Sequence, residues 1–135
     1  MKNVKTILSS VAFIMLVSVS AFAANGSKVI AVVNKADWCP VCQKNGMRAM
    51  ETFKANNKDM AIQFVGNDLT NDKTKAESRK ALKKVGLEKA MAKYNGTGMV
   101  YFFDADSKEL ITQISVAKSN NELAQAMKTA EKAAN

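Results

Sequence analysis

The segment KVIAVVNKADWCPVCQKNG, residues 28–46, decides the fold. Its first seven residues are almost all apolar, and three of them are valines, which is typical of a strand buried on both faces. A short turn then leads to Cys39 and Cys42, after which apolar or small side chains recur with the spacing of one helix face. Pro40 suits the first turn of a helix, where its missing N–H costs nothing. The segment therefore predicts a buried strand that leads through a cysteine-containing turn into a helix.

The rest of the chain predicts three more strands and two more helices. Thr74 with Glu77 and Ser119 with Glu122 have the spacing of capping boxes, and Gly86 predicts a break in the longer helix. A β-α-β-α-β-β-α order places helices on both faces of one mixed four-stranded sheet, which is a three-layer α/β fold. The expected elements are a strand at 28–34, a helix at 40–56, a strand at 61–66, a helix at 74–94, strands at 99–103 and 109–115, and a helix that begins after residue 119.

The beginning of the chain has the composition of a secretory leader. Two lysines precede an uncharged run over 7–24, and Ala21-Phe22-Ala23 fits the small-x-small pattern of a signal peptidase site. We therefore expect a signal peptide over 1–23, a mature domain over 24–135 and export to the periplasm, with no membrane span left after cleavage. An uncleaved leader would instead be a membrane anchor, because the apolar run is just long enough to span a bilayer.

The charge pattern argues against nucleic acid as a partner. Of 20 basic and 12 acidic residues, the leader holds two lysines and no acid, so the mature domain has a net charge of 18 − 12 = +6. Its lysines are scattered among acidic residues along the predicted helices, and no basic stripe contains interleaved aromatic residues. This distribution is typical of a solvated surface.

The two cysteines point to thiol and disulfide chemistry. Cys39 precedes the predicted helix, whose N-terminal amides and dipole stabilise a thiolate and make it the expected nucleophile. Cys42 lies one turn further on the same face and is the expected resolving thiol, so the two form a redox disulfide. A structural role is weak, because so short a loop stabilises little.

Other uses of a CxxC motif need residues that this chain lacks. Haem attachment requires a histidine directly after the second cysteine, and Gln43 stands there. A closed zinc site needs two more ligands, whereas the chain has no histidine and no third cysteine. We therefore expect neither a cofactor nor a resident metal.

With these motifs, the mature chain resembles the thioredoxin superfamily, and in particular the periplasmic thioredoxin-like domains of bacterial thiol:disulfide interchange proteins. ADWCPVC resembles the WCxxC turn of that family, VGNDLTND its second strand and loop, and GTGMVYFFDADSKEL its later hairpin. The resemblance implies a thioredoxin-like fold with thiol:disulfide oxidoreductase activity. We expect the substrate groove around the cysteines to be lined by Trp38, Pro40, Val41, Thr97, Gly98 and Met99.

The sequence departs from the family pattern at two places. The resemblance implies a cis-proline in the segment Gly96-Thr97-Gly98-Met99, but Pro40 is the only proline of the chain. We therefore expect Gly98 to give the groove a different shape, and Met99 to bring a thioether near Cys39. The resemblance also implies a buried acid six residues before the first cysteine, and Val33 stands there instead.

Three functions fit these residues. The first is an exported oxidoreductase, more of the reductase or isomerase type than a strong oxidant, which acts on protein or small thiol and disulfide substrates together with an upstream redox partner protein. The second is a protein that binds or delivers a soft metal ion such as Cu(I) through Cys39 and Cys42, with Met99 as a further ligand. The third is a non-catalytic interaction module that keeps the fold and uses its groove for one partner.

Overall fold

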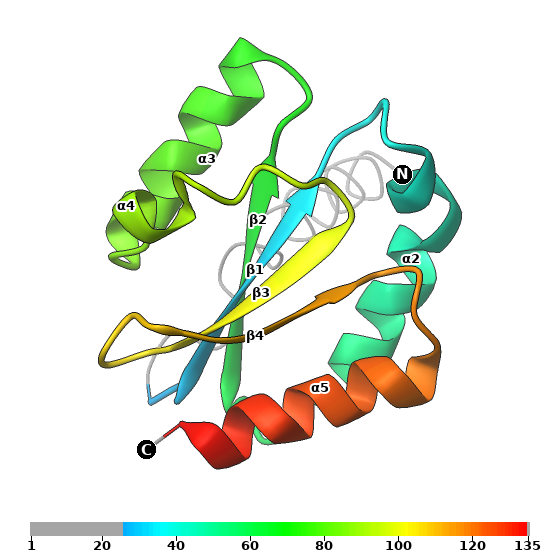
Figure 1. Cartoon of the computed structure of the whole chain (residues 1–135), viewed down its shortest axis with the longest axis vertical. Coiled ribbons are helices and arrows are strands. Elements are labelled where there is room, and N and C mark those ends of the chain that lie inside the picture. Colours follow the sequence, from blue (N-terminus) through cyan, green and yellow to red (C-terminus); the bar gives the residue numbers. More distant parts are fainter. Residues whose placement is uncertain (1–25, 135) are drawn as a thin grey trace, which may run out of the picture.

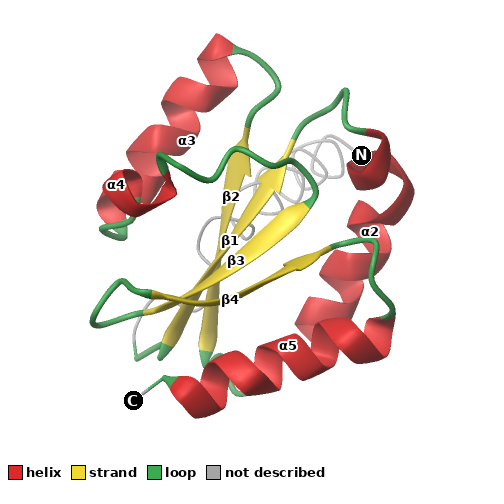
Figure 2. Cartoon of the chain, viewed as in Figure 1, coloured by secondary structure: helices red, strands yellow, loops and turns green. Residues whose placement is uncertain are grey.

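The computed structural model describes residues 26–134 (Figures 1 and 2). The described chain confirms the predicted order of elements, with the second predicted helix (74–94) divided into two helices. These elements are β1 (Val29–Lys35), α2 (Pro40–Ala55), β2 (Ile62–Asp68), α3 (Asp72–Lys84), α4 (Glu88–Met91), β3 (Met99–Asp104), β4 (Leu110–Ser115) and α5 (Asn120–Ala133).

The strands form one mixed four-stranded sheet in the order β2-β1-β3-β4. β1 pairs in parallel with β2 and antiparallel with β3, and β3 pairs antiparallel with β4 as the predicted hairpin. Parallel neighbours need a crossover connection, which α2 supplies between β1 and β2. The mixed sheet expected from the order of the elements is therefore confirmed.

Helices cover both faces of this sheet (Figure 2). Successive side chains of a strand point to opposite faces, so alternate residues of β1 serve different layers. Val29 and Ala31 pack in a core with α2 and α5, whereas Ile30 and Val32 pack in a core with α3 and α4. The two cores make the three layers that the sequence predicts.

The start of α3 differs from the prediction. Asn71 caps this helix: its side-chain oxygen accepts the N–H of Thr74 at 3.0 Å, and the Thr74 hydroxyl accepts the N–H of Asn71 at 3.0 Å. Thr74 is therefore the third helical residue, and the predicted capping box of Thr74 with Glu77 is wrong. Asn71 has the same spacing one turn earlier, and asparagine is as good a cap as serine or threonine.

Two other predicted helix signals are confirmed. Gly86 has a φ of 74°, a conformation that glycine adopts without steric cost, and it lies between α3 and α4. At the start of α5, the Ser119 hydroxyl accepts the N–H of Glu122 at 3.2 Å, and the Glu122 carboxylate accepts the N–H of Ser119 at 3.0 Å.

Side chains engage the outer backbone groups at both ends of the edge strand β2. The buried Asn57 side chain donates to the Ile62 carbonyl at 2.8 Å and accepts the Ile62 N–H at 3.1 Å. At the other end, the Asp68 N–H donates to the Ser78 hydroxyl at 2.8 Å. Such contacts limit the strand pairing that an open edge otherwise invites.

The predicted leader, residues 1–23, lies outside the described residues. Within residues 26–134, the structure has no helix with both the length and the apolar character needed to cross a membrane.

Candidate functional site

Cys39 lies immediately before the first turn of α2. Its backbone is extended, its carbonyl accepts the N–H of Gln43 at 3.0 Å, and its Sγ accepts the N–H of Cys42 at 3.3 Å. Pro40 takes the first helical position and leaves no amide unsatisfied there. The sulfur of Cys39 thus replaces the oxygen of an ordinary helix cap, at the place where the helix dipole favours negative charge.

Hydrogen bonds to Cys39 favour its thiolate form. Burial opposes ionisation, since only 3% of the residue is exposed. The Cys42 thiol, the Thr97 hydroxyl and the backbone amides of Cys42 and Val41 nevertheless lower the pKa of Cys39 below its ordinary value. Cys39 is therefore the thiol of this pair that ionises first.

The surroundings of Cys42 favour its protonated form. Burial raises the pKa of Cys42, and its hydrogen bond to Cys39 and the negative charge of Cys39 raise it further. Cys42 is nevertheless the more exposed residue of the two. Cys39 is thus the more readily ionised cysteine, whereas Cys42 is the more exposed one.

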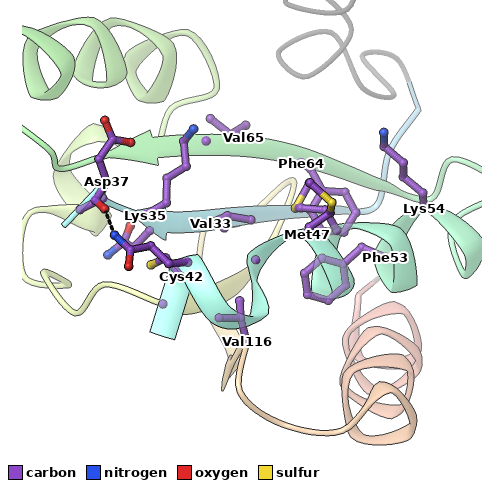
Figure 3. A pocket seen from close by; sticks show the side chains of 17 residues that line it. Val33, Lys35, Asp37, Cys42, Met47, Phe53, Lys54, Phe64, Val65 and Val116 are labelled. Atoms are coloured by element: carbon purple, nitrogen blue, oxygen red, sulfur yellow. Dashed lines mark hydrogen bonds between the residues drawn. The ribbon is translucent and has the colours of Figure 1, made fainter. Parts of the chain in front are cut away.

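An apolar cavity of about 750 Å³ adjoins Cys42 between α2 and the sheet (Figure 3). Cys42 lies near Lys35 and Asp37 at one end, whereas Phe53 and Lys54 lie at the other. Further residues that line this space are Val33, Met47, Met50, Phe64, Val65 and Val116. Val33, which stands where the family resemblance implies a buried acid, is therefore part of the apolar wall of this cavity.

The loop before β3 also approaches Cys39. The Thr97 hydroxyl is near enough to the sulfur to lower the pKa of Cys39, and Gly98 follows it with a φ of 76°. A Cβ added to Gly98 would lie 3.8 Å from Cys39 Sγ and 3.0 Å from Val41 Cγ1. The Gly98 N–H donates to the Asn34 carbonyl at 2.8 Å, and the Gly98 carbonyl accepts the N–H of Val116 at 2.9 Å. The missing side chain thus lets this backbone approach the Cys39 sulfur closely.

Three of the predicted groove residues form an exposed surface around Cys39. Trp38 is 59% exposed and Val41 is 39% exposed, and Pro40 is also exposed. The Trp38 indole N–H donates to the Thr70 carbonyl at 3.1 Å, which ties the ring to the loop after β2. These side chains offer an apolar surface beside the buried sulfur.

Met99 was predicted to bring its thioether near Cys39, but it lies on the other face of the sheet. Its side chain packs against the core that lies between the sheet and the helices α3 and α4. Within residues 26–134, no three side chains of the types His, Cys, Asp and Glu come together as a metal-binding group. The site thus brings Cys39 and Cys42 together with Thr97 and Gly98, while Met99 is committed to the core.

Two buried asparagines behind this loop were not predicted. Asn34 and Asn67 face each other across β1 and β2, and the Asn67 side-chain amide donates to Asn34 Oδ1 at 2.8 Å. The signal in the sequence is an asparagine at the end of each of two largely apolar strands. Such a residue is equally common as the start of a turn, so the pattern alone does not distinguish the two.

We expect a Thr97→Val variant to hold less thiolate at Cys39. Valine keeps the shape of threonine but cannot donate to the sulfur, so the pKa of Cys39 rises. Loss of one hydrogen bond to a charged group should reduce the thiolate fraction at pH 7 by about tenfold or more. Thiolate absorbance near 240 nm in a Cys42→Ser background measures this change. Thr129→Val on the exposed side of α5 is the control, and an equal loss there would contradict the role of Thr97.

Acidification should release Trp38 from its loop. Burial raises the pKa of Asp68, but hydrogen bonds from the Thr70 hydroxyl and amide, with the charge of Lys35 nearby, lower it below 3.8 overall. The stabilisation from this carboxylate is therefore complete above pH 3.8 and is lost as the pH falls through the lowered pKa. Since Trp38 is the only tryptophan, its fluorescence should change only below about pH 4. An Asp68→Asn variant that keeps the same step would contradict this assignment.

Comparisons with a family model and with solved structures agree with the fold described above. The family model of the thioredoxin-like domain matches residues 17–131, a range that begins within the predicted leader. The structure of the DsbH oxidoreductase is similar with a TM-score of 0.57 at 16% identity, over 84% of this chain and 79% of that one. Tryparedoxin I from Leishmania major is similar with a TM-score of 0.51 at 15% identity, over 75% of each chain. No curated protein matches the sequence. At these identities, the two structures are similar to this chain in fold.

Proposed function

Because this chain belongs to the thioredoxin-like family, we propose that it is an exported thiol:disulfide oxidoreductase that works through Cys39 and Cys42. The observation that carries the proposal is the position of Cys39 at the start of α2, where its Sγ accepts the N–H of Cys42 at 3.3 Å; the lowered pKa of Cys39 and the raised pKa of Cys42 agree with it. One thiol is thereby prepared to attack, while the other is kept protonated until a mixed disulfide has formed.

The proposed exchange has two steps. In the first, the Cys39 thiolate attacks a substrate disulfide, a bond forms between Cys39 and one substrate sulfur, and the other substrate sulfur leaves as a thiolate. In the second, Cys42 loses its proton to the released thiolate or to water and attacks Cys39. The Cys39–Cys42 disulfide forms, the second substrate thiolate leaves, and two electrons have passed to the substrate. An upstream thiol partner must then reduce the pair again.

The surroundings of Cys39 support a reductase or isomerase type of function. A strongly oxidising pair requires a reduced form whose thiolate is heavily stabilised. Here burial is the largest single influence on the pKa of Cys39, and it opposes the thiolate. The hydrogen bonds outweigh it, so we propose a thiol of intermediate activation.

The substrate is proposed to be a protein or peptide disulfide. Trp38 and Val41 expose apolar surface beside Cys39, and the Thr97–Gly98 backbone borders the sulfur. A peptide could therefore lie across this surface with its disulfide above α2. The predicted leader supports an encounter in the periplasm, where substrate disulfides persist.

Equilibration with redox buffers tests the proposal. We expect the Cys39–Cys42 pair to exchange with dithiothreitol and with a peptide disulfide, with a reduction potential between about −270 and −180 mV. Alkylation of the remaining thiols followed by mass measurement gives the oxidised fraction. A pair that forms a disulfide but does not exchange with thiols would refute the enzyme function. A potential near −120 mV would refute the reductase or isomerase type only.

A further inference from the structure

Asn34 is a buried polar residue at the end of an apolar strand face. It follows Ile30 and Val32 on the face of β1 that packs toward α3 and α4, and none of its surface is exposed. Burial of an amide costs free energy unless its donors and acceptor are satisfied. The partners of Asn34 are therefore a guide to what this residue does.

All the polar groups of the Asn34 side chain have partners. Its Nδ2 donates to the Tyr94 carbonyl at 2.9 Å and to the Gly96 carbonyl at 3.1 Å. Its Oδ1 accepts the Asn67 amide at 2.8 Å, and its backbone carbonyl accepts the Gly98 N–H at 2.8 Å. One residue thus holds three points of the loop before β3, while Asn67 fixes the orientation of its side chain from β2.

The loop that Asn34 holds forms one side of the Cys39 environment. Thr97, whose hydroxyl lowers the pKa of Cys39, lies between the two attachment points Gly96 and Gly98, and a Cβ on Gly98 would lie 3.8 Å from Cys39 Sγ. The chain has no proline in this loop that would stiffen it, since Pro40 is its only proline. The loop is therefore held to β1 by the hydrogen bonds of Asn34.

We propose that Asn34, oriented by Asn67, is a positioning residue that holds the Thr97–Gly98 segment against Cys39. Asn34 acts only through the loop: it places a donor at the thiolate and so influences how readily the nucleophile ionises. The inference concerns the same site as the proposed oxidoreductase function and deepens it. Its test depends on ionisation of one thiol, which needs neither substrate nor turnover.

The test is a pH titration of Cys39 in the full chain with Cys42→Ser, so that a single thiol absorbs near 240 nm. In this background, Asn34→Leu removes every side-chain hydrogen bond of Asn34 without adding charge. We expect the thiolate fraction at pH 7 to fall about three- to tenfold, because Thr97 is no longer held at the sulfur. Amide hydrogen exchange at Gly98 should become faster in the same variant, because the side-chain bonds to Tyr94 and Gly96 that hold the neighbouring loop are lost, although the backbone acceptor of Gly98 stays.

Asn57→Leu is the matched control. Asn57 is as deeply buried as Asn34, its side chain makes two backbone hydrogen bonds, and its partner Ile62 lies away from the cysteines. We expect this variant to lose stability while the titration of Cys39 stays as in the parent. A shift equal to that of Asn34→Leu would show a general effect of destabilisation and would overturn the proposal.

A second variant keeps the proposal testable if Asn34→Leu does not fold. Asn67→Leu removes only the bond that orients the Asn34 amide, and we expect a change in the same direction of about two- to threefold. An unchanged titration of Cys39 in either folded variant would overturn the proposal. Failure of wild-type protein to exchange with disulfides would count against the oxidoreductase function and leave the result of this titration unaffected.

Discussion

A Cys42→Ser variant should accumulate as a mixed disulfide with a disulfide-containing peptide, whereas a Cys39→Ser variant should react more slowly, by up to about tenfold for each unit that separates the two pKa values. Cys39 retains three of its four thiolate-stabilising contacts when Cys42 becomes serine, namely Thr97 and the two backbone amides. In the other variant Cys42 loses the influence of Cys39, but burial still raises its pKa, so most of it stays protonated at pH 7. Since only the thiolate attacks a disulfide, the two variants separate nucleophile from resolving thiol.

Mass measurement after an acid quench gives the fraction of mixed disulfide at each time. The two variants carry the same substitution three residues apart, so each controls for the other. Exposure predicts the opposite result, because Cys42 is partly exposed whereas 3% of Cys39 is exposed. Faster trapping through Cys42 would therefore show that access, rather than ionisation, decides which sulfur reacts, and would contradict the role of Cys39.

The asymmetry of the two thiols also bears on how the oxidised pair would be reduced. A thiol that attacks Cys42 expels Cys39, whose lowered pKa makes it the better leaving group. A thiol that attacks Cys39 expels Cys42, whose raised pKa makes it the poorer leaving group. Reaction from the side of Cys42 is thus favoured by leaving-group stability and by exposure. The same hydrogen bonds that activate Cys39 in the reduced state stabilise it as the product of reduction.

The strand and helix around the CxxC motif could be predicted because local and global signals agree there. The apolar residues of β1 must be buried on both faces, and Pro40 can only be tolerated in the first helical turn. Because Pro40 is the first residue of the helix, Cys39 directly before it must be the N-cap. The start of α3 was harder, because Asn71 and Thr74 both precede a suitable partner by three residues, and only the tertiary structure selects between them.

The arrangement behind the site could not be predicted from sequence spacing. Asn34 and Tyr94 are 60 residues apart, and the bond between them depends on the pairing of β1 with both β2 and β3. The orientation of Met99 is equally non-local, because a shift of one residue in strand register exchanges the two faces of the sheet. The sequence identifies Gly98 as a departure from the family pattern, but its positive φ and its contacts come from the fold.

A Gly98→Ala variant should be less stable than wild type by about 1–3 kcal/mol. Two costs add at this position. A φ of 76° disfavours any residue with a Cβ, and the new Cβ would lie 3.0 Å from Val41 Cγ1 and 3.3 Å from Val41 Cβ. Because Val41 belongs to the first turn of α2, relief of this contact must move either that turn or the loop that touches Cys39. We therefore expect both the midpoint of urea unfolding and the thiolate fraction of Cys39 to fall.

Gly46→Ala is the matched control, since a Cβ added there meets no atom within 4 Å beyond its chain neighbours and the backbone of its own helix. That variant should be more stable by up to about 1 kcal/mol, because alanine is the better helix former. A double variant of Gly98→Ala with Val41→Ala separates the two costs at Gly98: the steric cost disappears while the backbone cost remains. Partial recovery of stability is therefore expected. Full wild-type stability in Gly98→Ala alone would contradict both the positive φ and the close contact with Val41.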